Sequence, residues 1–170
     1  NLSYKDKTNK KALMGTITHK VMQILGDKSL AVAKGEDKVV DDELGTFTLK
    51  QCDDLSYVND LAFDYYVNNF PEVVLTDSEK RTCLKWAEKA VAYQDGMFDP
   101  RNQDVFATEL FFDIEIQENW AKYNYRVGKE NVKGNLAIKG TVDLIVKQGE
   151  NYYEILDYKT GKRINWATGE

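Results

Sequence analysis

The chain has 170 residues, of which 42% are hydrophobic and 30% are charged, and its formal net charge is −5. These values fit one soluble globular domain over residues 1–170, and no apolar run approaches the roughly 18 residues of a membrane span. The acidic balance argues against a protein that holds nucleic acid by bulk charge, although basic residues cluster near both ends of the chain.

Helical periodicity predicts a first helix over residues 10–26. Apolar residues recur there at i, i+3 and i+4 spacing, and Gly26 is a plausible stop. The following residues, 27–45, are charged and weakly patterned. We therefore expect mostly loop in that segment.

Two further helices are predicted before the middle of the chain. One runs from about residue 53 to residue 70 and ends at Pro71, which cannot continue a helix. The next begins at "TDSE", where Thr76 or Asp77 caps the helix and Glu79 can complete a capping box.

The hydrophobic period changes to two in the second half of the chain. Residues 106–116 alternate between an apolar face and a face that carries Glu109, and residues 136–147 alternate in the same way. A short turn then leads to a third strand over residues 152–160, which completes a hairpin. Helices first and a largely antiparallel sheet afterwards predict an α/β (α+β) layer fold.

The hairpin brings two acids together. With a three-residue loop at 149–151, Asp143 faces Asp157, and directly opposite Cβ atoms lie about 4.5–5.5 Å apart. Two carboxylates at that distance repel unless a positive charge lies between them. Lys159, on the same face as Asp157, is one candidate, and a divalent metal is the other. The alternative is a hairpin face whose charges simply point at water.

The two cysteines, Cys52 and Cys83, lie far apart and form no CxxC spacing. Buried free thiols are the simplest interpretation of both, and a reducing cytoplasmic setting is the default expectation.

The stretches "GTVDLI" (140–145) and "EILDYKTGK" (154–162) resemble the core of the PD-(D/E)XK nuclease superfamily, in the branch typified by the RecB and AddB nuclease domains. "GTITH" supplies Gly15 and His19, where that branch often has a glycine-x-x-x-histidine helix. The resemblance extends from about residue 13 to residue 163. It implies a restriction-endonuclease-like core, with a mixed central sheet and a catalytic hairpin flanked by helices.

The resemblance also implies roles for individual residues. Asp143 and Asp157 would be the principal ligands of Mg²⁺ or Mn²⁺. Lys159 would position or help deprotonate the attacking water and offset charge on the scissile phosphate. Glu109 would be an outer ligand or would orient a metal-bound water. A histidine ligand, a carbonyl ligand and two basic DNA contacts complete the set: His19, Tyr158, Lys162 and Arg163.

Individual residues also have simpler interpretations. His19 lies off the apolar stripe of its helix and Glu109 lies on a polar strand face, so each could be solvent-exposed. The chain ends at "RINWATGE" without the glutamine-x-x-x-tyrosine helix of many relatives, and we expect a fragment lacking that helix. The cysteines do not match the four-cysteine pattern of iron–sulfur relatives, and no such cluster is expected.

The residues and the resemblance together predict a metal-dependent deoxyribonuclease that acts as an exonuclease in recombination, repair or phage DNA processing. The resemblance implies DNA as the partner, and no membrane association is expected. One rival is a non-catalytic nucleic-acid-binding module of the same fold. Another is an acidic interaction domain that binds a structural cation. The complete set of Asp143, Asp157 and Lys159 favours the enzyme, because a pure binder has no need of paired acids.

Overall fold

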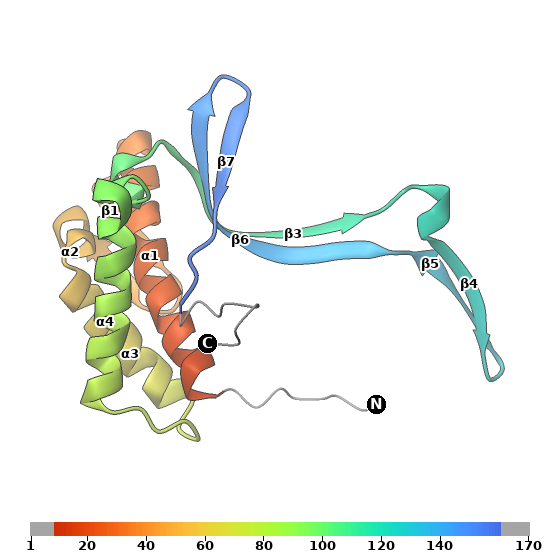
Figure 1. Cartoon of the computed structure of the whole chain (residues 1–170), viewed down its shortest axis with the longest axis horizontal. Coiled ribbons are helices and arrows are strands. Elements are labelled where there is room, and N and C mark those ends of the chain that lie inside the picture. Colours follow the sequence, from red (N-terminus) through yellow and green to blue (C-terminus); the bar gives the residue numbers. More distant parts are fainter. Residues whose placement is uncertain (1–8, 161–170) are drawn as a thin grey trace, which may run out of the picture.

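The computed structural model describes residues 9–160. Four helices pack together on one side, and strands β3 to β7 leave them as a short upright hairpin and a long ribbon (Figure 1). Helices beside antiparallel sheets confirm the predicted α+β fold class. None of the helices described is long and apolar enough to cross a membrane.

Helix α1 (Lys10–Lys34) is longer than predicted. The expectation that Gly26 ends it was wrong, since the helix continues to a left-handed cap at Gly35, where φ is 74°. Gly26 is buried instead, and a Cβ there would lie 2.5 Å from Cγ2 of Thr108. The glycine thus lets the sheet approach the helix closely.

The predicted loop over residues 27–45 was also wrong in part. Its first part, through Lys34, belongs to α1, and strand β1 (Lys38–Asp41) then pairs antiparallel with β2 (Gly45–Thr48). The carboxylate of Asp41 accepts the backbone N–H groups of Glu43 and Leu44 and so organises the turn. Strands of four residues are too short to show a clear hydrophobic period.

The second predicted helix is present as two pieces, α2 (Leu49–Asp53) and α3 (Leu55–Asn69). The chain breaks at Asp54, whose carboxylate accepts the N–H of Tyr57 and caps α3.

Helix α4 (Asp77–Ala92) begins as predicted after Thr76. The backbone N–H of Thr76 donates to the Glu79 carboxylate at 2.7 Å, which is one half of the expected capping box. Cys52 and Cys83 are both buried and free, as expected.

Helix α1 is the centre of the core. Its apolar side chains pack against α3 and α4 at one end and against β1, β2 and α2 at the other. The fully buried apolar residues of α1 are Leu13, Ile17, Val21, Met22, Ile24 and Leu25.

The main sheet has the order β3-β6-β7, with β3 (Val105–Glu115), β6 (Ala137–Gly149) and β7 (Tyr152–Leu156). Another hairpin connects β3 to β6; its strands are β4 (Lys122–Val127) and β5 (Glu130–Asn135). A mixed sheet was expected, but every ladder within residues 9–160 is antiparallel. The strands follow one another through turns and hairpins, which favour antiparallel pairing.

The predicted hairpin register is present within the ladder. Leu144 pairs with Leu156 and Lys147 with Tyr153, but the ladder ends one pair before Asp143 and Asp157. The turn is shorter than the expected three-residue loop, because Gly149 already pairs with Tyr152, and a bulge between Lys147 and Gly149 accounts for the shift in register.

The apolar face of β6 is buried over only part of its length. Leu144 is 1% exposed, whereas Leu136 on the same predicted face is 50% exposed. The reason is visible in Figure 1, where the outer part of the β3–β6 ribbon extends beyond the helices.

A matched pair of substitutions tests this division of β6. Leu144→Ala should lower the free energy of unfolding by about 2–5 kcal/mol, because it leaves a cavity against α1. Leu136→Ala should cost no more than about 1 kcal/mol. Urea unfolding followed by circular dichroism measures both, and equal losses would show that the outer ribbon is packed after all.

Candidate metal centre

Three potential metal ligands converge from three elements. His19 comes from α1, Glu109 from β3 and Asp143 from β6, and all three are partly buried. One ligand atom of each lies within 4.8 Å of the others. The Nδ1 atom of His19 lies 3.4 Å from Oδ1 of Asp143, so the imidazole faces the sheet and not bulk solvent.

The backbone of β3 changes direction at Glu109. Its neighbours Thr108 and Leu110 pair with Leu144 and Val142, which sets Glu109 opposite Asp143. Glu109 has a φ of 43°, in the left-handed region that a non-glycine residue adopts at a cost of about 1–3 kcal/mol. Such strain inside a strand is a common device for aiming a functional side chain.

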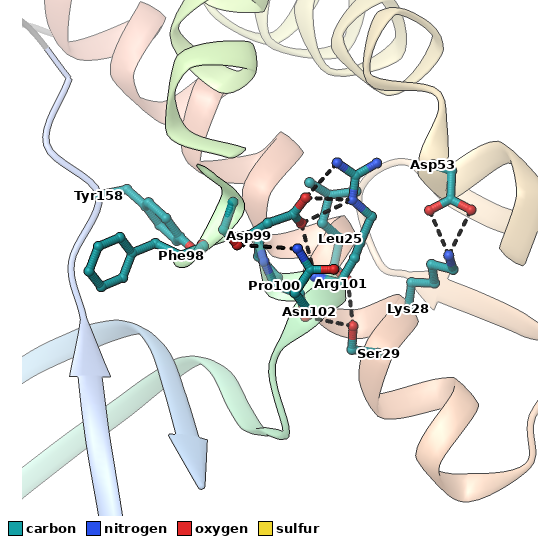
Figure 2. Close-up of polar contacts among 11 residues, drawn as sticks. Leu25, Lys28, Ser29, Asp53, Phe98, Asp99, Pro100, Arg101, Asn102 and Tyr158 are labelled. Carbon is teal, nitrogen blue, oxygen red and sulfur yellow. Dashed lines mark hydrogen bonds and ion pairs between the residues drawn. The ribbon is translucent and has the colours of Figure 1, made fainter. Parts of the chain in front are cut away.

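Asp143 is tied to the segment that follows β7. Its Oδ2 accepts the backbone N–H of Tyr158 at 2.7 Å. The hydroxyl of Tyr158 donates in turn to the carbonyl of Phe98 at 3.1 Å (Figure 2). Tyr158 is therefore held at both ends. Burial raises the pKa of its hydroxyl, and the carboxylates of Asp99 and Asp143 add to the effect, so the group stays a donor.

The turn that receives Tyr158 is itself anchored to α1. Arg101 pairs with Asp99 at 2.6 Å, and the hydroxyl of Ser29 on α1 donates to the carbonyl of Pro100 at 2.9 Å (Figure 2). These contacts fix the short 3-10 turn η2 (Pro100–Asn102) and, through it, the carbonyl of Phe98. The chain after β7 thus rests on α1 as well as on the sheet.

The centre has an excess of negative charge in a partly buried place. Burial raises the pKa of Glu109, and the carboxylate of Asp143 raises it further, while His19 and Lys20 act in the opposite direction. Burial also raises the pKa of the nearby Asp27. Lys20 offers little relief, because its ammonium group already pairs with Asp41 at 3.0 Å and with Glu43 at 2.7 Å.

Asp157 and Lys159 lie beside this group and not within it. The Lys159 ammonium contacts the Asp157 carboxylate at 2.7 Å, and their side chains are 84% and 50% exposed. The β6–β7 ladder ends at Leu156, so the backbone beyond it no longer holds Asp157 directly over Asp143. Both residues line a cleft of about 500 Å³ between this segment and α4. Lys162 and Arg163 lie outside the described residues.

Two positioning features escaped the sequence interpretation. A Cβ at Gly15 would lie 3.0 Å from Oγ1 of Thr160, so the glycine of "GTITH" gives room for the segment after β7. His19 follows one helical turn later on the same side of α1. The spacing of this pair was visible in the sequence, but the partner of the glycine was not. The anchoring of the Tyr158 hydroxyl had no sequence signal.

The family profile of the PD-(D/E)XK nuclease superfamily matches residues 2–168. The chain therefore belongs to this superfamily. Neither the curated proteins nor the solved structures provide a significant match.

The donor set suits the divalent metal that nucleases of this superfamily typically use. Carboxylate oxygens bind Mg²⁺ and Mn²⁺, and a neutral imidazole suits Mn²⁺ better than Mg²⁺. Asp143, Glu109 and His19 supply these donors in a site where burial penalises uncompensated negative charge. A bound cation would offset that penalty.

Binding of Mn²⁺, measured by calorimetry, tests this centre. Asp143→Asn and His19→Ala should each weaken binding at least about tenfold, because the first removes the negative charge of the carboxylate and the second removes the imidazole ligand. Affinity should also fall as the pH drops toward the raised pKa of Glu109, since the protonated carboxyl no longer binds metal.

Asp113→Asn is the matched control, because Asp113 lies further along β3 and pairs with Lys139 on the ribbon. It should leave Mn²⁺ binding unchanged. If the control weakens binding as much as Asp143→Asn does, the ion is attracted by general surface charge and the assigned centre is wrong.

Proposed function

We propose that this chain is a Mg²⁺- or Mn²⁺-dependent deoxyribonuclease of the RecB/AddB-like branch. It would hydrolyse phosphodiester bonds of DNA, as an exonuclease in recombination, repair or phage DNA processing in the cytoplasm. The observation that best supports this is the group of His19, Glu109 and Asp143, which lies next to the ion pair of Asp157 and Lys159. The chain also belongs to a nuclease superfamily.

Phosphodiester hydrolysis must bring a nucleophilic water to a phosphate that is already negative. When bound, Mg²⁺ or Mn²⁺ lowers the pKa of the water that it binds and screens the charge on the phosphate. His19 and Asp143 would hold the ion, and the backbone N–H of Tyr158 keeps the Asp143 carboxylate oriented. Glu109, whose pKa is raised, would join His19 and Asp143 as a ligand and would also orient the water and accept its proton.

Asp157 is assigned as the further acidic ligand, and the carbonyl of Tyr158 as a neutral one. The Asp157 carboxylate is half exposed and pairs with Lys159. A cation at the centre would compete for this carboxylate, because a divalent charge attracts it more strongly than one exposed ammonium does. The same competition would release Lys159 toward the substrate.

Lys159 is assigned as a hydrogen-bond donor to the scissile phosphate. Hydrogen bonding to Asp157 raises the pKa of its ammonium group, so the group is a cation at neutral pH. A protonated lysine cannot take a proton from water. Lys159 would therefore act by positioning the phosphate and by stabilising the negative charge that develops on it.

The cleft beside the centre supports a nucleic-acid substrate. Trp86 and Tyr93 contribute aromatic surface to it and Lys89 a positive charge, while Asp157 and Lys159 form its other wall. Aromatic rings next to cations are the usual means of holding a nucleic-acid strand.

Cleavage of labelled DNA in Mn²⁺ tests the proposal. Lys159→Ala should bind Mn²⁺ and DNA like the parent and cleave at least about a hundredfold more slowly, because the lost contact acts mainly in the transition state. Lys139→Ala is the control, since Lys139 is also an exposed lysine paired with an aspartate at 2.7 Å. It should cleave at the parent rate.

Two outcomes would contradict these assignments. Parent-like cleavage by Lys159→Ala would make Lys159 a surface charge only. Absence of cleavage by the parent in both metals, with DNA binding retained, would favour the non-catalytic nucleic-acid-binding module.

A further inference from the structure

Hairpin β4–β5 stands at the far end of the ribbon, away from the helices and from the metal centre (Figure 1). Its two strands make their main contacts with each other. Neither face of this hairpin is needed to cover the core. A partner could therefore contact its side chains without disturbing the core.

The register divides the hairpin into two unlike faces. Residues directly paired across two strands share a face, and successive residues alternate. One face consists of three cations, each paired with an asparagine, and carries no carboxylate; these pairs are Lys122 with Asn135, Lys133 with Asn124, and Arg126 with Asn131. We call this the basic face.

The basic face contrasts with the chain as a whole, whose net charge is −5. Lys122, Arg126 and Lys133 are exposed. None of them forms an ion pair within residues 9–160, whereas the next lysine along the ribbon, Lys139, pairs with Asp113. Three uncompensated cations on one side of a narrow ribbon form a local binding site for a polyanion.

The opposite face is occupied by its own aromatic contacts. A Cβ at Gly134 would lie 2.6 Å from the hydroxyl oxygen of Tyr123, so that ring lies over the glycine. Tyr125 packs against Tyr123 with ring centroids 5.7 Å apart. Tyr123 is engaged with the ribbon, while Tyr125 is 55% exposed. The rings and the cations lie on opposite faces, whereas a groove for single-stranded nucleic acid combines stacking rings with cations.

We propose that hairpin β4–β5 is a duplex-DNA contact, an inference that rests on the proposed function. A two-stranded ribbon fits the major groove, which is about 12 Å wide. Lys122 and Arg126, four residues apart on β4, are separated by about 13 Å of strand, or about four base-pair steps, and so reach different phosphates. Asn124 lies between Lys122 and Arg126 on β4. Asn131 lies next to Arg126 and Lys133, so that both amides can meet base edges.

Binding of a short labelled DNA duplex, measured by anisotropy in EDTA, tests the basic face without metal-dependent cleavage. The double variant Arg126→Gln/Lys133→Gln should bind at least about tenfold more weakly, and the slope of log K against log salt should become shallower by about 2, as expected for two lost phosphate contacts. Lys34→Gln/Lys50→Gln removes the same charge from exposed lysines on α1 and α2, and it should bind like the parent.

Parent-like binding by the hairpin variant would overturn the proposal, and so would an equal loss in the control. A hairpin-dependent preference for single-stranded DNA or RNA over duplex would overturn the assignment of the partner. Unchanged circular dichroism and Mn²⁺ affinity should accompany the loss of binding, because the hairpin is remote from the core. If the protein binds duplex DNA through the hairpin but does not cleave it, the proposed nuclease function is wrong and the proposed contact is right. If it cleaves DNA and the hairpin variant binds like the parent, the nuclease function is right and the proposed contact is wrong.

Discussion

The carboxylate of Asp143 joins the three parts of the molecule that make a site. One oxygen accepts the N–H of Tyr158 after β7, and the other faces His19 on α1. Glu109 on β3 lies opposite it in the sheet. The close approach of sheet and helix at Gly26 makes this meeting possible, because any side chain there would push Thr108 away.

This arrangement is costly unless a cation joins it. Glu109 and Asp27 both have raised pKa values because they are partly buried, and Lys20 is already engaged with two other acids. The strained backbone of Glu109 adds to that cost. A site that concentrates negative charge at the expense of stability is typical of a metal-dependent enzyme, and family membership makes the same case independently.

The sequence predicted what depends on local patterns. The capping box at Thr76, the existence of strands β3 and β6 and the hairpin register follow from neighbouring residues or from alternation. The prediction for Gly26 was wrong, because the sequence does not distinguish a glycine that makes room for a neighbouring strand from a glycine that ends a helix. Alternation also could not show where β6 leaves the core, or that Asp157 lies just beyond the ladder and pairs with Lys159. Those facts depend on tertiary contacts.

Anomalous scattering from crystals soaked in Mn²⁺ tests the central position of Asp143 most directly. We expect a single strong peak about 2.0–2.3 Å from ligand atoms of Asp143, Glu109 and His19. The Asp157 carboxylate should have left Lys159 to join them. A peak remote from Asp143, or one held by exposed acids alone, would contradict the assignment of this site.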